Sequence, residues 1–230
     1  MKAYDILLFD LDGVILDFTK AEELSFRETF RAYGITVTPE FFASYREINH
    51  RRWQAYEKGL IDNEECTVGR FRELFEKIGF QADPKQFALD YQAGLGEGHF
   101  LMPYAREVLE KLAPKFRLYV VTNGVSSTAR NRLSGTDTEK YFRGLFISEE
   151  MGAQKPSREY FEQVAAGIPA FDRARTLLIG DTLSSDIRGA ANAGIDCCWV
   201  NLSHKENDTE LVPTYEISDL RELLKIPGLS

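Results

Sequence analysis

Apolar positions in residues 18–98 recur every three or four residues, which is the spacing of amphipathic helices, and no convincing strand interrupts them. Glycines follow the periodic segments, and Pro39 and Pro84 suit first-turn positions. This part of the chain is therefore expected to be entirely helical. The predicted helices are Thr19–Tyr33, Pro39–Lys58, Asn63–Ile78 and Pro84–Leu95.

From Pro103 onward, short apolar runs alternate with helical segments. This alternation predicts βαβ units and a parallel sheet. The N-terminal run Asp5–Phe9 must join that sheet, because a lone strand could not bury both faces. We expect an α/β fold: a Rossmann-like parallel sheet core, residues 1–17 and 99–230, interrupted by a helical domain, residues 18–98. The predicted later strands are Leu118–Thr122, Leu145–Ser148, Thr176–Ile179 and Cys197–Val200, and the helices are Ala105–Leu112, Ser126–Leu133, Glu159–Gly167 and Ser185–Ala193.

The amino-acid composition limits the possible binding partners of the protein and indicates its cellular compartment. The 230 residues are 43% hydrophobic, enough for a sizeable core, and carry a net charge of −8. That charge disfavours nucleic acid or an anionic membrane surface as partner. No apolar run is long enough to span a membrane, and no signal peptide is expected. Cys197 and Cys198 are predicted to fill a strand, and the odd cysteine count fits a reducing, cytoplasmic setting.

Candidate chemistry begins directly after the first predicted strand, with Asp10 and Asp12. Two like charges at the exit of a buried strand need a cation or another partner to offset lost hydration. Asp10-Leu11-Asp12-Gly13 could also be a plain turn. A calcium loop of the EF-hand type is excluded, because its glycine stands sixth and a helix precedes it. A divalent metal with a phosphorylated substrate is the explanation we favour.

Three more strand ends carry polar residues. Thr122-Asn123-Gly124 precedes a helix, where hydroxyl, amide and backbone N–H groups can cradle phosphate, although a helix cap would look the same. Lys155 follows the next strand as a possible counter-charge, and Asp181 follows the one after. Asp186 belongs to the first turn of the next predicted helix, which Ser184 or Ser185 could cap. Ligands bind at the carboxyl edge of such sheets, and oxygen ligands favour Mg²⁺.

At these residues the chain resembles the haloacid dehalogenase (HAD) superfamily of phosphohydrolases. Asp10–Val14 resembles the first family motif, Val121–Gly124 the second, Lys155-Pro156 the third and Gly180–Asp186 the fourth. The helical domain resembles the C1 cap, which closes over the site. Further segments resemble the pyrimidine 5′-nucleotidase branch: Thr122–Val125, Ile147–Lys155, Gly194–Trp199, Lys205–Asn207 and Pro213–Ile217.

The resemblance implies a role for each residue. Asp10 is the expected nucleophile, Asp12 the general acid and base, and Lys155 the catalytic counter-charge. The expected Mg²⁺ ligands are Asp10, the backbone carbonyl of Asp12 and Asp181. Asp186 is expected to contact these ligands without binding the ion itself. The expected phosphate-binding residues are Thr122, Asn123, Gly124 and Lys155.

The implied activity is Mg²⁺-dependent hydrolysis of a small phosphorylated metabolite, a nucleoside monophosphate above all, by a monomer or homodimer. Val14 replaces the threonine of many members, as in the β-phosphoglucomutase branch. A sugar-phosphate phosphatase or mutase-like enzyme therefore stays open, as does a non-catalytic phosphate-binding module. Asp12 argues against the dehalogenase branch. Most cap aromatics are expected to pack within the cap, and His50 to lie on its surface.

Overall fold

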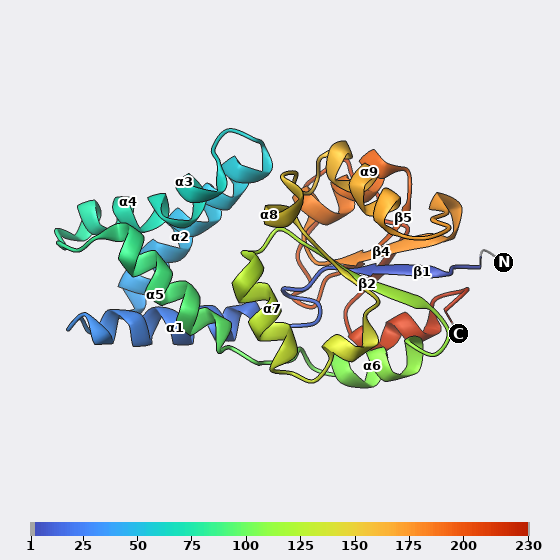
Figure 1. The fold of residues 1–230 in the computed structure, drawn as a ribbon, viewed down its shortest axis with the longest axis horizontal. Helices are drawn as coiled ribbons and strands as arrows, with labels where there is room; N and C mark the ends of the chain where they lie inside the picture. The colour runs from blue at the N-terminus through green and yellow to red at the C-terminus, as the bar shows by residue number, and fades with distance from the viewer. Residues whose placement is uncertain (1–2, 230) are drawn as a thin grey trace. The chain divides into compact units, whose positions relative to one another are not determined.

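The computed structural model describes residues 3–229 and contains one parallel sheet. Within these residues the sheet has six strands in the order β3-β2-β1-β4-β5-β6 (Figure 1). The N-terminal strand β1 lies at its centre, where Phe9 pairs with Val120 of β2 and Ile179 of β4. The predicted α/β fold is confirmed. The strands are β1 Ile6–Phe9, β2 Arg117–Thr122, β3 Leu145–Ile147, β4 Thr176–Gly180, β5 Asp196–Val200 and β6 Tyr215–Ile217.

Both faces of the sheet are covered, which explains the unbroken apolar runs of its strands. Side chains alternate along β1: Leu7 and Phe9 belong to one hydrophobic cluster, and Ile6 and Leu8 to the other. The first cluster includes helices α6 (Ala105–Leu112) and α7 (Ser126–Ser134) and the 3₁₀ helix η4 (Leu220–Lys225). The second includes α9 (Arg158–Gly167) and α10 (Arg188–Ala193), on the opposite side of the sheet (Figure 1).

Several boundaries differ from the predictions. Strand β3 ends one residue early, and a short helix, α8 (Ser148–Met151), follows it. The edge strand β6 was not predicted, because three residues are too few to show a period of two. The short 3₁₀ helices η1 (Glu139–Tyr141) and η2 (Arg173–Arg175) were also not predicted. The predicted strand filling by Cys197 and Cys198 is confirmed, since both are buried and unpaired in β5.

The helix predicted over residues 185–193 begins earlier, with a π-helical turn, η3 (Leu183–Ile187), before α10. The prediction that Ser184 or Ser185 caps it is wrong. Thr182 occupies the capping position without a side-chain cap, and its backbone N–H donates to the carboxylate of Asp186 at 3.1 Å. An ionised carboxylate is a stronger acceptor than a hydroxyl, so Asp186 satisfies this end of the helix.

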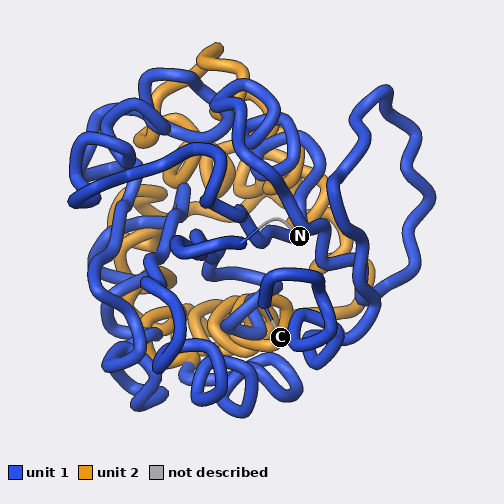
Figure 2. The backbone as a smooth tube through the Cα atoms, turned by 90° about the vertical axis from the view of Figure 1, so that its right-hand side faces the viewer, with its two compact units in different colours: residues 1–18, 99–230 blue, residues 19–98 orange. Residues whose placement is uncertain are grey.

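The chain divides into two compact units (Figure 2). One comprises the chain up to Phe18 together with everything from His99 on, and the other is Thr19–Gly98. The second unit is helical throughout, with no strand in this fully described stretch. None of the helices among residues 3–229 has the length and apolarity needed to cross a membrane. The helices of this part are α1 Phe18–Ala32, α2 Pro39–Glu57, α3 Asn63–Thr67, α4 Gly69–Ile78 and α5 Pro84–Gly96.

Aromatic side chains fill the interior of the helical unit. Phe26, Phe30, Tyr45, Phe71 and Phe87 are fully buried, and their rings pack in tilted and stacked pairs. The expected packing role of the cap aromatics therefore holds for most of them. His50 is exposed, as predicted.

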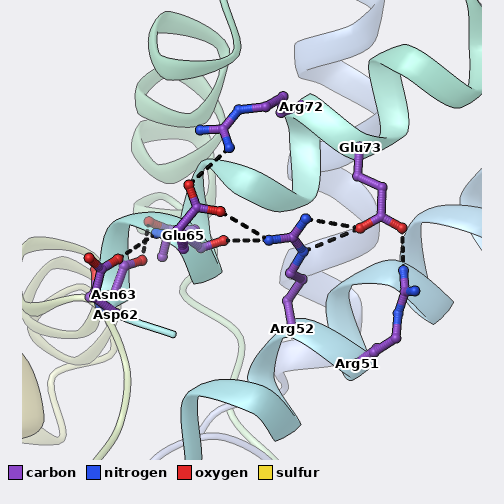
Figure 3. Close-up of polar contacts among 8 residues, drawn as sticks. Arg51, Arg52, Asp62, Asn63, Glu65, Arg72 and Glu73 are labelled. Atoms are coloured by element: carbon purple, nitrogen blue, oxygen red, sulfur yellow. Dashed lines mark hydrogen bonds and ion pairs between the residues drawn. The ribbon is translucent and has the colours of Figure 1, made fainter. Parts of the chain in front are cut away.

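The single helix predicted over residues 63–78 is wrong, because the chain breaks at Val68 into α3 and α4. A Cβ on Gly69 would lie 2.7 Å from Nη1 of Arg52, so the glycine leaves room for that guanidinium at the break. Arg52 donates to Glu65 beside the break and to Glu73 on α4 (Figure 3). This ion-pair network ties α2 to both short helices.

Candidate active site

The carboxyl ends of the three central strands meet at one edge of the sheet. Asp10 follows β1, Thr122 ends β2 and Asp181 follows β4. These strands are parallel and paired in register, so the residues after them lie side by side. Lys155 reaches the same edge from the loop after α8. Residues that were predicted from four separate segments are thus brought together.

The ammonium group of Lys155 lies at the centre of the site. Its Nζ is 2.6 Å from Oδ1 of Asp10, 2.7 Å from Oδ1 of Asp186 and 3.0 Å from the carbonyl oxygen of Val121. The side chain is only 2% exposed. Burial by itself lowers the pKa of Lys155, but the charges of Asp10 and Asp186 more than offset this and raise it. Lys155 is therefore a permanent positive charge.

Three carboxylates surround this charge. Asp10, Asp181 and Asp186 each place an oxygen within 4.8 Å of the others. Burial raises the pKa of Asp10 well above its usual range against the lowering effect of Lys155. Burial, then the charge of Asp186, raises the pKa of Asp181 to about 6. When all three carboxylates are ionised, they and the one ammonium leave two uncompensated negative charges, which one divalent cation would balance. The all-oxygen donor set fits Mg²⁺.

Asp186 belongs to this cluster more directly than the sequence suggested. It is fully buried; Oδ1 accepts from Lys155, and Oδ2 accepts from the backbone N–H of Thr182. A Cβ on Gly180 would overlap the Asp186 carboxylate, so only glycine permits this approach. Asp186 therefore fixes Lys155 and also offers an oxygen at the possible cation position.

Two further contacts hold Asp181 in place. Gly13 has φ +78°, and a Cβ there would overlap the Asp181 carboxylate, so the loop after β1 passes directly against this side chain. The indole Nε1 of Trp199, on the neighbouring strand β5, donates to the backbone carbonyl of Asp181 at 3.0 Å. Trp199 thus connects a segment that looked peripheral in the sequence to a possible metal ligand.

The second segment of the site, Thr122–Gly124, makes two kinds of contact. Oγ1 of Thr122 accepts from the backbone N–H of Gly124 at 3.1 Å, which folds the turn tightly. The Asn123 amide is engaged with the main chain of Lys155, accepting from its N–H at 2.8 Å and donating to its carbonyl at 2.9 Å. Asn123 therefore positions Lys155, and phosphate binding by its amide stays a prediction, as it does for Thr122 and Gly124.

The carboxylate of Asp12 lies outside the three-carboxylate cluster. Its Oδ1 accepts from Nη1 of Arg132, which comes from α7 and is 1% exposed. The sequence analysis missed Arg132. A signal existed: Ala129 and Leu133 define the apolar stripe of the predicted helix, and Arg132 is three residues after Ala129, on the same face.

Carboxylates and a buried lysine at the carboxyl edge of a parallel α/β sheet form a site that can hold a cation and an anionic ligand. Residues 7–200 match the family described as haloacid dehalogenase-like hydrolase. The chain belongs to this family, and it is an enzyme of the phosphatase type, as the resemblance implied.

Relatives of known name extend over nearly the whole chain. The HAD-hydrolase YfnB of Bacillus subtilis is 42% identical over 226 residues, covering 98% of this chain and 96% of the relative. Two pyrimidine 5′-nucleotidases also match. PynA of Streptococcus pneumoniae is 35% identical, and the match covers 96% of this chain and 94% of PynA. YjjG of Escherichia coli is 33% identical, covering 96% of each.

The crystal structure of YfnB superposes on this chain with a TM-score of 0.93 and covers 98% of this chain and 99% of its own. That structure is described as bound to magnesium and as revealing interdomain movement. At 42% identity, the likeness supports the assignment of both fold and family.

Proposed function

We propose that this protein is a Mg²⁺-dependent phosphomonoesterase that acts through an aspartyl-phosphate, with pyrimidine nucleoside monophosphates as substrates. The observation that carries the proposal is the cluster of Asp10, Asp181 and Asp186 around Lys155, with its excess of two negative charges. Such a site is unfavourable on its own, and one divalent cation would balance its two excess negative charges.

The residues divide the chemistry between them. Asp10 attacks phosphorus, a P–O bond to its carboxylate forms, and the ester P–O bond breaks. Asp12 gives a proton to the departing ester oxygen and then takes one from the water that hydrolyses the aspartyl-phosphate, which regenerates Asp10. Lys155 stabilises the charge of the transferring oxygens, together with Thr122 and the backbone at Gly124.

Mg²⁺, when bound, would neutralise carboxylate and phosphate charge, and Asp10, Asp181 and the backbone carbonyl of Asp12 are the proposed ligands. Asp186 is the fourth candidate, because one of its oxygens lies within the same cluster. The rest of the site holds these groups in place, since phosphoryl transfer depends mostly on positioning and electrostatics.

The substrate class rests on the relatives. PynA and YjjG are named pyrimidine 5′-nucleotidases, and the chain matches each over 96% of its length, helical unit included. We propose that the helical unit, Thr19–Gly98, is the cap that reads the leaving group. The buried, unpaired cysteines Cys66, Cys197 and Cys198 fit a reducing compartment, and we place the enzyme in the cytoplasm.

A substrate panel tests the proposal. Phosphate release is measured from dUMP, dTMP, UMP, a hexose phosphate and phosphoglycolate, with Mg²⁺ and with excess chelator. We expect Mg²⁺-dependent release, fastest from the pyrimidine nucleotides, and loss of activity in Asp10→Asn with the fold retained. Phosphatase activity of Asp10→Asn above a trace would refute the nucleophile.

The panel also separates the alternatives. Isomerisation of a hexose phosphate without phosphate release would establish a mutase, for which Val14 is the motivating residue. Failure to hydrolyse even an aryl phosphate in the presence of Mg²⁺ would leave a phosphate-binding module and refute the enzymatic mechanism proposed here.

A further inference from the structure

Arg132 is a buried cation that the proposed chemistry does not yet use. Its guanidinium, on α7, is 1% exposed and donates to the carboxylate of Asp12, whose side chain is 31% exposed. The ring of Phe18 covers it, with a distance of 5.5 Å from Cζ to the ring centroid. Arginine keeps its charge at any working pH, and burying that charge is unfavourable unless it is paired. The Asp12 carboxylate compensates this buried charge, and the position of Arg132 favours this placement of the Asp12 carboxylate.

Two groups of cations can attract the Asp12 carboxylate: Arg132 on one side, and the proposed metal ion with Lys155 on the other. Asp12 is only two residues from Asp10, so the second attraction is also close. In the structure the Asp12 carboxylate is nevertheless excluded from the cluster and turned to Arg132. In an in-line displacement the leaving oxygen lies opposite the nucleophile. A proton donor is useful only on that far side, away from Asp10.

We propose that Arg132 is the positioning residue of the proton donor: it holds Asp12 off the cation cluster and on the leaving-group side. This inference rests on the proposed function of Asp12. In this proposal Arg132 influences the reaction through Asp12 and not by binding substrate or cation, so its contribution depends on how much the leaving group needs a proton.

That dependence separates positioning from a merely structural role. A nucleoside monophosphate leaves as an alkoxide, which must be protonated, whereas p-nitrophenyl phosphate leaves as a stable phenolate. General acid catalysis contributes about 10²- to 10⁴-fold where it is needed. Because kcat/KM reports the steps through aspartyl-phosphate formation, loss of a placed donor lowers it mainly for the nucleotide.

The experiment compares Arg132→Met with the wild type in saturating Mg²⁺, on dTMP and on p-nitrophenyl phosphate. We expect kcat/KM to fall about 100-fold on dTMP and less than about fivefold on p-nitrophenyl phosphate. The ratio of the two values does not depend on the fraction of protein that is folded. If the methionine variant does not fold, Arg132→Lys carries the same test, and we expect a ratio shift of at least about threefold in the same direction.

Arg130→Met is the matched control. Arg130 lies on the same helix and also forms an ion pair, but its side chain is 46% exposed and its partner is Glu150, at 2.8 Å, instead of Asp12. We expect it to leave the substrate ratio unchanged. An equal loss on both substrates in Arg132→Met, or no loss on either, would overturn the proposal.

A double-mutant cycle distinguishes failure of this inference from failure of the proposed function. Asp12→Asn should itself lower the dTMP to p-nitrophenyl phosphate ratio, and adding Arg132→Met to it should change the ratio no further. If Asp12→Asn leaves the ratio unchanged, Asp12 is not the donor and its proposed role fails. If Asp12→Asn changes the ratio and Arg132→Met does not, only the inference about Arg132 fails.

Discussion

Replacing Lys155 by methionine removes the one ammonium that two buried carboxylates share. The methionine fills a similar volume, so the change is mainly one of charge. Nζ of Lys155 lies 2.6 Å from Asp10 and 2.7 Å from Asp186, and the three side chains are 2%, 10% and 1% exposed. Without Lys155, both carboxylates stay in the interior with no cation nearby.

The expected loss of stability is large because the pair is buried. Breaking a buried ion pair by removing one partner costs about 3–5 kcal/mol. For a protein of this size, one kcal/mol shifts Tm by about 2–4 °C, so Lys155→Met should lower Tm by about 10 °C without metal. Lysine also lowers the pKa of Asp10, against the larger raising effect of burial. Removing it raises that pKa further, so stability is lost at neutral pH and recovered as acid protonates the carboxylate.

Thermal and urea unfolding at about pH 7.5 and about pH 5 measure this, without and with Mg²⁺. Lys140→Met is the matched control, because Nζ of Lys140 is also 2.6 Å from a carboxylate, that of Asp137, but its side chain is 54% exposed. We expect no measurable shift for the control, and a deficit in Lys155→Met that shrinks in acid and on addition of Mg²⁺. A deficit equal to the control, or one independent of pH, would refute the reasoning.

Three further predictions concern Asp181. In Gly13→Ala the new Cβ clashes with the Asp181 carboxylate, and the backbone at φ +78° is strained for alanine. Mg²⁺ should therefore bind at least about tenfold more weakly by calorimetry, and unchanged affinity would contradict the close approach. Trp199→Phe removes the donor to its backbone carbonyl and should weaken Mg²⁺ binding about tenfold, whereas loss of stability alone would count against this link. Burial, then Asp186, raises the pKa of Asp181 from 3.8 to about 6. Its contribution to metal-free stability is therefore full below pH 3.8 and lost as pH rises through 6. Mg²⁺ should raise Tm more at about pH 7.5 than at about pH 5, and the reverse order would exclude this linkage.

The spacing of apolar residues along the chain was enough to predict the order of most strands and helices. Strand β1 and its neighbours read as unbroken apolar runs because helices cover both faces of the sheet. The order of strands and helices then required a parallel sheet, and a parallel sheet brings all its carboxyl ends to one edge. Asp10, Lys155 and Asp181 could be grouped in advance for that reason, although they lie far apart in the chain.

Contacts between side chains of distant segments had no local signature. The helix breaks at Val68, next to the Gly69 position where the Arg52 guanidinium packs, and strand β6 is paired with β5. Neither feature changes the spacing of apolar residues nearby. A break or an edge strand of this kind depends on what packs against it.

The fine geometry of the site has the same origin. The Asn123 amide holds the backbone of Lys155, and Asp12 is held by Arg132, 120 positions further along the chain. Periodicity reports which residues are buried, since burial follows from the repeat of a helix or strand. It carries no record of which buried polar groups pair, because each pairing is settled by the full set of neighbours that folding brings within reach.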